Sequence, residues 1–177
     1  MKKNNTNTCA SLYTPKVMEA FKNPHNYGKI KNADGIGKVG NIVCGDVMWL
    51  YIKVGDPIRK PSASNGARNK KHDEIIEDIK FETFGCVAAI ATSSMITDLV
   101  KGKTINNALK VSKDDIIKKL GGLPSIKYHC SVLAADALIE AVYDYYLKQG
   151  KDFPEGLIEK HKKIAKEAEI AEKTFQD

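Results

Sequence analysis

Long apolar runs are missing from this chain of 177 residues. No stretch approaches the ~18 consecutive apolar residues that a membrane-spanning helix needs, so we expect no membrane span and no membrane partner. The first segment, MKKNNTNTCA, has neither the apolar core of a secretory signal nor the arginines of an obvious transit peptide. We therefore expect a cytoplasmic protein, or a protein of an organelle matrix if a transit peptide has been removed.

Aromatic residues are also scarce, at 7% of the chain. The net charge of +6 reflects a surplus of basic residues, but these are not gathered into one stripe interleaved with aromatic side chains. This distribution disfavours nucleic acid as a partner, and docking to an acidic protein explains the charge equally well. Hydrophobic residues make up 42% of the chain, which is enough for the core of one domain.

The predicted elements come in the order one helix, three strands and then further helices, which argues for an α+β fold. We expect a three-stranded antiparallel sheet with helices packed on one face. The segment 123–130, LPSIKYHC, is predicted to be extended, because proline disfavours the helical conformation in the residue before it. The predicted strands are 34–39, 46–54 and 75–83, and the predicted helices lie within 11–24, 87–102, 104–110, 112–122, 130–150 and 154–175.

The chain is predicted to have one domain with an N-terminal tail, an inserted loop and a C-terminal extension. Residues 1–11 are polar, and we expect a disordered tail there. Residues 12–150 form the domain, and 56–73, rich in Pro, Ser, Asn, Gly and charge, is predicted to be a mobile insertion loop. Residues 151–177 are predicted to add a solvated C-terminal helix.

Only four cysteines are present, and a cytosolic chain with so few more often uses them for metal or redox chemistry than for disulfides. Cys9 lies in the polar N-terminal segment. Cys44, Cys86 and Cys130 each stand at a predicted junction between elements. Such a repeated placement is hard to explain by core packing.

Cys44 lies in the sequence VCGD, where one strand gives way to the next. Gly45 lets the backbone turn sharply, and Asp46 follows two residues after the cysteine, so both side chains could point to one centre. The alternative is that Cys44 is a small buried hydrophobic residue and Asp46 a turn residue.

Cys86 and Cys130 are both predicted to lie at the N-terminal end of a helix. The positive end of the helix dipole there lowers the pKa of a thiol and favours the thiolate. His129, next to Cys130, offers a neutral ligand or a proton shuttle, and Lys127 offers a cation for a thiolate or an anionic cluster. The alternatives are a packed cysteine beside the capping Gly85, a histidine on an exposed turn and a solvated lysine. The other histidines, at 25, 72 and 161, are expected at the surface.

Three thiolates with one carboxylate and one imidazole suit a soft transition metal or an iron–sulfur unit. The same donors suit tetrahedral zinc in a structural or regulatory site. A third hypothesis, a nucleophilic pair of Cys130 and His129, is disfavoured because adjacent residues do not face each other in a helix or strand.

At these residues the chain resembles the IscU/NifU-type scaffold proteins on which iron–sulfur clusters are assembled. The resemblance covers residues 12–147 and implies an IscU-like (SufE/NifU-type) fold and a scaffold rather than an enzyme. The matching stretches are YTPKVMEAFKNPHNYG, VCGDVMWLYIKV, FETFGCVAAIATSS, VKGKTINNALK and LPSIKYHCSVLAADALIEAV.

The resemblance also implies a site. A [2Fe–2S] cluster, built from iron and persulfide sulfur, would be held by Cys44, Cys86 and Cys130. Asp46 or His129 would complete the fourth position, and Fe²⁺ or Zn²⁺ would occupy the site before the cluster forms. Cys130 would accept sulfur from a cysteine desulfurase, with Lys127 in an auxiliary role.

Further partners follow from the same resemblance. They are a ferredoxin-like electron donor, acceptor apoproteins, a frataxin-like protein, and Hsp70 and J-type chaperones. Tyr13 would contribute to sulfur release through contact in a homodimer. The segment for the chaperone would be Leu123, Pro124, Ser125, Ile126 and Lys127.

The chain departs from the family at three places. Ser125 replaces the second proline of the chaperone segment, the loop 56–73 is longer than usual and is basic, and the tail continues after Gly150. The alternative within the resemblance is a zinc-binding, SufU-like sulfur acceptor. His129 favours the scaffold branch, because the SufU branch usually lacks this histidine.

Overall fold

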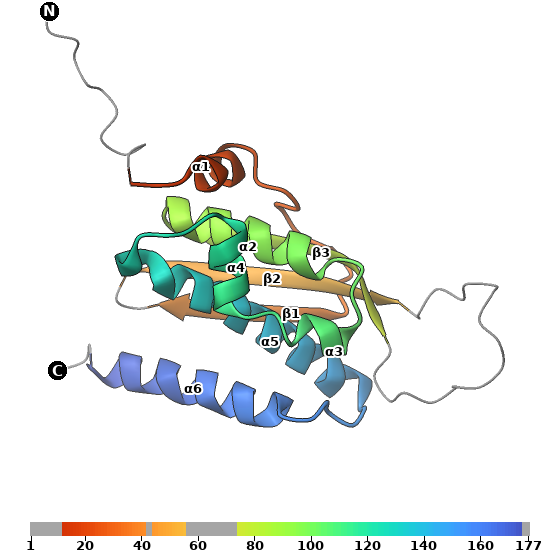
Figure 1. Ribbon diagram of the computed structural model, residues 1–177. Helices are drawn as coiled ribbons and strands as arrows, with labels where there is room; N and C mark the ends of the chain where they lie inside the picture. The colour runs from red at the N-terminus through yellow and green to blue at the C-terminus, as the bar shows by residue number, and fades with distance from the viewer. Residues whose placement is uncertain (1–11, 42–43, 56–73, 175–177) are drawn as a thin grey trace, which may run out of the picture.

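The structure is a computed structural model that describes residues 12–41, 44–55 and 74–174. The predicted tail 1–11 and the predicted insertion loop 56–73 lie outside the described residues. In chain order the elements are α1 (Pro15–Lys22), β1 (Gly35–Asn41), β2 (Asp46–Gly55), β3 (Ile75–Phe84), α2 (Val87–Val100), α3 (Ile105–Ala108), α4 (Lys113–Lys119), the 3₁₀ turn η1 (Ser125–Lys127), α5 (Tyr128–Gln149) and α6 (Leu157–Thr174) (Figure 1).

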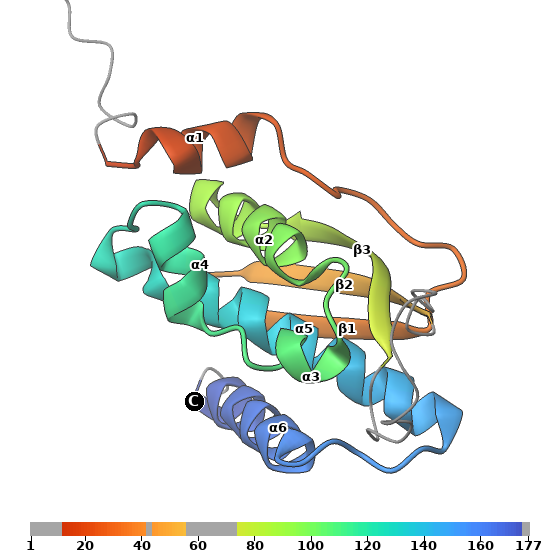
Figure 2. The same ribbon diagram turned by 45° about the vertical axis from the view of Figure 1, so that its right-hand side comes forward.

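The three strands form one antiparallel sheet in the order β1-β2-β3. Buried and exposed residues alternate along β1, because successive side chains of a strand point to opposite faces of the sheet. Helices α2 and α5 pack against each other on the same face of the sheet, and α4 contacts both (Figures 1 and 2). The predicted α+β fold, with a three-stranded antiparallel sheet covered by helices on one face, is confirmed.

Helix α5 lies directly on strand β1 because two glycines of the strand face it. A Cβ atom at Gly35 would collide with the backbone carbonyl oxygen of Ala141. A Cβ atom at Gly37 would collide with the carbonyl oxygen of Ala137. The glycine-rich sequence of the first strand therefore serves the close approach of a helix backbone.

A hydrogen-bonding side chain stands at the start of each of the helices α1, α3 and α4. Thr14, Thr104 and Ser112 each accept a hydrogen bond from a backbone N–H in the first turn of the helix that follows. Ser112 and Asp115 also form a complete capping box. These bonds satisfy N–H groups that have no acceptor within the helix.

The prediction of an extended segment at 123–130 is wrong. The N–H of Lys127 donates to the carbonyl oxygen of Pro124 at 2.8 Å, which closes the 3₁₀ turn η1, and α5 begins at Tyr128. Proline restricts the residue before it, Leu123, but its own fixed φ angle suits the start of a helical turn. His129 therefore lies inside the first turn of α5 rather than before it.

Helix α6 is attached to α5 by aromatic stacking and a hydrogen bond between side chains. The ring of His161 stacks on Tyr143 with centroids 3.7 Å apart, and Tyr143 stacks on Phe153 at 5.0 Å. His161 Nδ1 lies 2.9 Å from a carboxylate oxygen of Glu140. His161, expected at the surface, is a half-buried contact between two helices.

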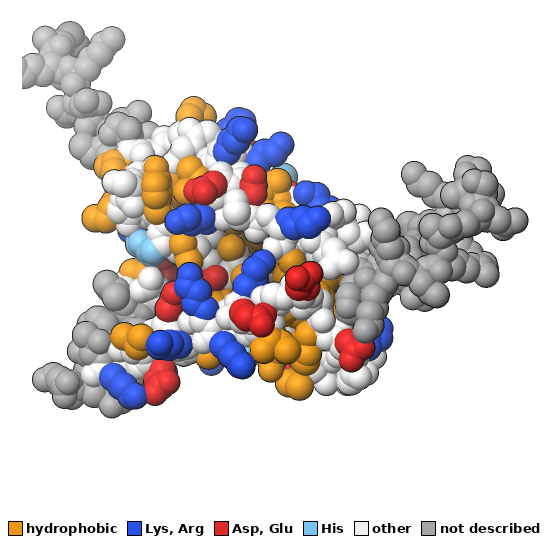
Figure 3. Space-filling model, turned by 60° about the horizontal axis from the view of Figure 1, so that its bottom comes forward, with side chains coloured by type: hydrophobic (Ala, Val, Ile, Leu, Met, Phe, Trp, Pro, Cys, Tyr) orange, Lys and Arg blue, Asp and Glu red, His pale blue; other side chains and the backbone are white. Residues whose placement is uncertain are grey.

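Figure 3 shows the underside of the molecule, which is the side that carries α6. Basic, acidic and hydrophobic side chains are interspersed on the coloured part of this face, without a continuous patch of one charge. None of the helices in the described part of the chain has the length and apolar character that crossing a bilayer requires.

Candidate metal centre

The pairing of the strands brings two of the cysteine segments to one end of the sheet. Asp46 is the first residue of β2 and pairs with Asn41, the last residue of β1. Its neighbour Val47 pairs with Phe84, the last residue of β3. The residues just before β2, Cys44 and Gly45, and those just after β3, Gly85 and Cys86, therefore lie at the same end of the sheet.

The third segment, the first turn of α5, is tied to α2 by a buried hydroxyl group. Thr92 Oγ1 lies 3.1 Å from the carbonyl oxygen of Cys130 and 3.2 Å from that of Ala89 in its own helix. Thr92 and Cys130 are both buried. The sequence analysis missed this contact, because it joins residues 38 positions apart and no local pattern marks it.

The carboxylate of Asp46 belongs to two overlapping sets of metal-ligating atoms. One set adds Cys44 and His129, and the other adds Cys86 and Cys130; within each set the atoms lie within 4.8 Å of one another. Asp46 Oδ2 is 3.7 Å from the sulfur of Cys130 and 4.0 Å from that of Cys86. All five residues that the sequence singled out as ligands thus lie together.

Solvent exposure falls steeply across the centre. Cys44 is exposed, Cys86 is partly buried and Cys130 is fully buried, so the three thiols form a gradient from solvent to core. Asp46 is 4% exposed and lies between them. An ion or a sulfur atom would therefore arrive on the side of Cys44.

Two glycines give the centre its shape. Gly45 has φ +71°, a left-handed conformation that a residue with a side chain rarely adopts, and it turns the chain between Cys44 and Asp46. A Cβ atom at Gly85 would lie 2.9 Å from Asp46 Oδ1 and 2.8 Å from the Cβ of Ala89. Gly85 thus leaves the space in which the carboxylate sits, a role that the sequence analysis did not assign to it.

Cys86 and Cys130 share one negative charge in the metal-free centre. The Cys130 thiol donates a hydrogen bond to the Cys86 sulfur, 3.8 Å away, and this bond lowers the pKa of Cys86 to about 5. The backbone N–H groups of Ala88 and Ala89 add to the lowering. The same bond, together with burial and the nearby negative charges, raises the pKa of Cys130. The expectation of a lowered pKa holds for Cys86 and is wrong for Cys130, because only Cys86 receives the backbone donors of a helix N-terminus.

Lys127 and Tyr13 lie on the border of this centre. The negative charge of Cys86 raises the pKa of Lys127, and Tyr13 contributes in the same direction. The ammonium group of Lys127 is therefore within electrostatic reach of the thiols, as its place beside Cys130 in the sequence suggests. Their auxiliary roles stay predictions.

The imidazole of His129 has a buried nitrogen without a hydrogen-bond partner among the described residues. Its Nε2 atom is buried, and no described residue offers it a hydrogen bond. A buried nitrogen without a partner is costly unless something else satisfies it, and a metal ion satisfies an imidazole nitrogen. The sulfur, oxygen and nitrogen donors together suit a soft or borderline metal.

The predicted chaperone segment is a short turn with mixed exposure. Leu123 is 8% exposed and belongs to the core, whereas Ile126 is 74% exposed and Ser125 is also exposed. Pro124 and Lys127 are partly buried. Only the middle of the segment is thus presented on the surface.

Comparison with known proteins agrees with this geometry. Residues 12–60 and 67–152 match the family described as NifU-like N terminal domain. The chain belongs to the NifU-like N-terminal domain family. The match ends before α6 begins.

Relatives in this family carry informative names. The chain is 51% identical over 159 residues to the iron-sulfur cluster assembly scaffold protein IscU 1 of Archaeoglobus fulgidus, covering 90% of this chain and 89% of the relative. It is 45% identical over 139 residues to the iron-sulfur cluster assembly scaffold protein IscU of Aquifex aeolicus, covering 78% and 79%. The crystal structure of the N-terminal part of a nitrogen-fixing NifU-like protein from Brucella abortus has the same fold, with TM-score 0.53, 20% identity and coverage of 77% and 96%.

Proposed function

We propose that this protein is a scaffold on which iron–sulfur clusters are assembled and from which they pass to acceptor proteins. The observation that carries the proposal is the convergence of three thiols, a carboxylate and an imidazole at a centre that is exposed at Cys44. The names of relatives that are 45–51% identical over most of the chain support it. The protein acts as a carrier, and the cluster is its cargo.

The cargo in this proposal is a [2Fe–2S] cluster. Cys44, Cys86 and Cys130 would supply thiolates, and Asp46 or His129 the fourth ligand. A carboxylate oxygen is a hard ligand and exchanges on iron more readily than a thiolate, so Asp46 would be the point from which the cluster leaves.

Sulfur would arrive after the metal. Cys130 must be a thiolate to accept sulfur, and in the metal-free centre its pKa is raised. A bound ferrous ion displaces the proton of a ligating thiol. The Cys130 thiolate then attacks the outer sulfur of a persulfide on a cysteine desulfurase; a new S–S bond forms on Cys130, and the desulfurase leaves as a thiolate. Two electrons from a ferredoxin-like donor reduce each transferred sulfur to sulfide.

A zinc-binding sulfur acceptor is the second candidate, because three thiolates with one nitrogen or oxygen also suit tetrahedral zinc. Anaerobic reconstitution with iron and sulfide separates the two. We expect visible absorption bands in the wild type and their loss in each of the variants Cys44→Ala, Cys86→Ala and Cys130→Ala. Zinc gives no such bands, so a colourless product that retains zinc would favour the second candidate.

The remaining partners stay predictions. They are a frataxin-like protein, Hsp70 and J-type chaperones, and a second copy of the chain in a homodimer. The cytoplasmic location also stays a prediction. A chaperone that reads 123–127 as an extended peptide would have to pull Leu123 out of the core. We therefore expect chaperone binding to expose this segment to hydrogen exchange.

A further inference from the structure

An open cavity of about 570 Å³ lies between α6, α5 and the edge strand β1. Its lining includes Asp46 and His129, which also belong to the metal centre, whereas Cys44, Cys86 and Cys130 do not line it. Small-molecule sites in proteins have volumes of roughly 300–1,000 Å³ and combine apolar walls with a few polar groups. The cavity fits this description.

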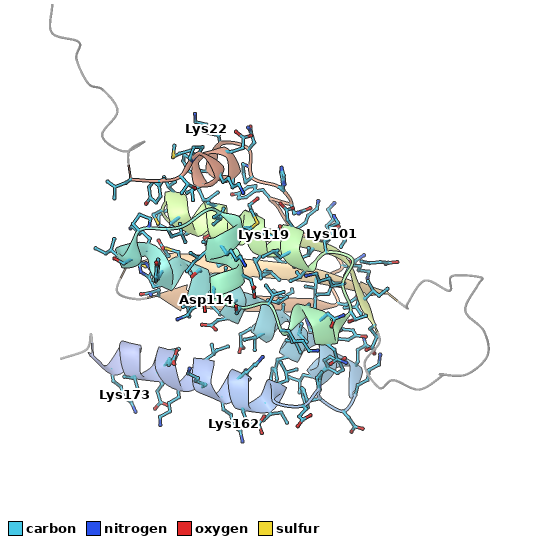
Figure 4. The ribbon with its side chains drawn as sticks, in the orientation of Figure 1. Lys22, Lys101, Asp114, Lys119, Lys162 and Lys173 are labelled. Carbon is cyan, nitrogen blue, oxygen red and sulfur yellow. The ribbon has the colours of Figure 1, made fainter. Side chains whose placement is uncertain are left out.

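The side of α6 that lines the cavity leaves apolar side chains exposed to solvent. Ile164, Ala165 and Ala168 of α6 line it, and both alanines are exposed. Lys162 and Lys173 lie on the other side of α6, away from the body of the protein (Figure 4). Because α6 lies beyond the residues that match the family, the cavity is formed by an element outside the family's common domain.

One acidic group on the wall lacks a partner. Asp136 has no hydrogen bond or ion pair within the described part of the chain, whereas Glu140 beside it binds His161. Burial raises the pKa of Asp136 to about 6, and Glu167 adds to this effect. Above that pH the cavity holds an ionised carboxylate that nothing neutralises by direct contact.

Two basic residues at or beside the cavity, Lys38 and Lys163, contact side chains other than Asp136. The ammonium group of Lys38 lies 5.7 Å from the centre of the Trp49 ring. Lys163, whose charge lowers the pKa of Asp136, makes no direct contact with it: Lys163 is 78% exposed and pairs with Glu167 at 3.8 Å. The polar part of the lining is thus acidic in character.

A divalent metal ion is a poor match for Asp136. Both groups of three metal-ligating side chains in the described residues belong to the metal centre, and neither includes Asp136. Hard divalent ions require several converging oxygen atoms. Among the carboxylates that line the cavity, Glu140 and Glu167 have partners of their own, so the carboxylate of Asp136 instead suits one ammonium group on a hydrocarbon chain.

We propose that this cavity binds a small organic cation, a primary ammonium group carried on a short apolar chain. The ammonium group donates to the carboxylate of Asp136, and the chain lies between α5, at Val132 and Leu133, and the alanines of α6. This assignment does not rest on the scaffold function, because neither Asp136 nor the apolar wall of the cavity belongs to the metal-ligating groups.

A ligand bound in the cavity should change the affinity of the metal centre for its ion. Asp46 and His129 belong to both sites, so a ligand that changes their positions changes metal affinity. The effect is reciprocal, because two linked binding equilibria alter each other by the same factor. Metal bound at the centre should therefore change the affinity for the cation.

The test is isothermal titration of the metal-free full chain with three probes of similar size, pentylamine, 1-pentanol and pentanoate. The titration is run well above the pKa of Asp136. We expect saturable binding of pentylamine, weaker binding of pentanol and none of pentanoate. A charge-assisted hydrogen bond contributes about 1.5–3 kcal/mol, so Asp136→Asn should weaken pentylamine binding by about 10- to 100-fold and leave pentanol unchanged.

Two control variants complete the design. Asp114→Asn makes the same chemical change on α4 (Figure 4), at a residue that does not line the cavity, and should leave all three affinities unchanged. Ala168→Trp should fill the cavity and abolish binding of both pentylamine and pentanol, with an unchanged circular dichroism spectrum. Absence of saturable pentylamine binding, equal affinity for the three probes, or an unaltered affinity in Asp136→Asn would each overturn the proposal.

Discussion

The sulfur atoms of Cys86 and Cys130 lie 3.8 Å apart, although 44 positions separate the two residues. At this distance two thiolates repel each other, and a thiol with a thiolate attract. The charge settles on Cys86, which the N-terminus of α2 faces, and the proton on buried Cys130. The metal-free centre is therefore asymmetric before any ion binds.

This asymmetry predicts an unusual dependence of stability on pH. The folded pKa of Cys86, about 5, lies below the ordinary value of 9.0, whereas that of Cys130 lies above it. Between about pH 5, the folded pKa of Cys86, and the ordinary value of 9.0, the unfolded pair holds two protons and the folded pair holds one. The free energy of unfolding of the metal-free protein should therefore rise with pH in this range. Above the ordinary value the unfolded pair holds none and the folded pair still holds one, so stability should fall.

Urea unfolding across this range measures the effect, with Cys86→Ser as the control. Removing Cys86 removes the acceptor of the proton on Cys130, so both slopes should flatten in the variant. Identical pH profiles for the wild type and Cys86→Ser would show that the pair does not share a proton.

Gly85 should be required for the geometry of the metal centre. A Cβ atom there would press on Asp46 and Ala89, and the carboxylate would have to move. We expect Gly85→Ala to bind cobalt(II) or zinc about tenfold or more weakly, the usual cost of disturbing the surroundings of a metal ligand. Gly40→Ala is the matched control, because a Cβ atom there meets nothing closer than 3.7 Å. Equal affinities in the two variants would contradict the role of Gly85.

Thr92 should hold the first turn of α5 in place. Thr92→Val keeps the shape of the side chain but removes the hydrogen bond to the carbonyl oxygen of Cys130. We expect the free energy of unfolding to fall by about 1–2 kcal/mol, as for a buried hydrogen bond that loses one partner. Thr92→Ser, which keeps the hydroxyl group, should retain the metal affinity of the wild type. If Thr92→Val also retains it, the bond supports stability alone.

Helix α6 should detach when His161 is removed. His161→Ala deletes the stack on Tyr143 and the hydrogen bond with Glu140, which together contribute about 1–3 kcal/mol in such partly buried settings. Backbone amides of α6 should exchange hydrogen faster, while those of β2 stay unchanged. Lys162→Ala, one residue away on the outer side of the helix, is the control. Unchanged exchange in His161→Ala would place the attachment of α6 elsewhere.

Asp46 should govern the release of the cluster. With an exchangeable oxygen ligand removed, Asp46→Ala should transfer its cluster to an acceptor apoprotein more slowly, by about tenfold. The measurement is the gain of activity or colour in the acceptor after mixing. Equal transfer rates in the variant and the wild type would remove this role from Asp46.

Local chemistry allowed much of the molecule to be predicted. The caps at Thr14 and Ser112 and the strand that begins at Asp46 follow from short-range preferences, because a cap or an alternating strand involves only neighbouring residues. The placement of Cys44 and Cys86 at element junctions was visible for the same reason. The three cysteines and their two companions could thus be nominated as one site.

By itself, then, the sequence determined which residues could bind a metal and which segments would be helix or strand. Only the tertiary structure decided how the candidates share charge, with Cys86 ionised and Cys130 protonated, because burial and hydrogen bonds between distant segments set a pKa. It also decided that Leu123 is buried and that Asp136 faces a cavity under α6. These properties depend on what each side chain meets across the fold, and no pattern of neighbours along the chain contains that information.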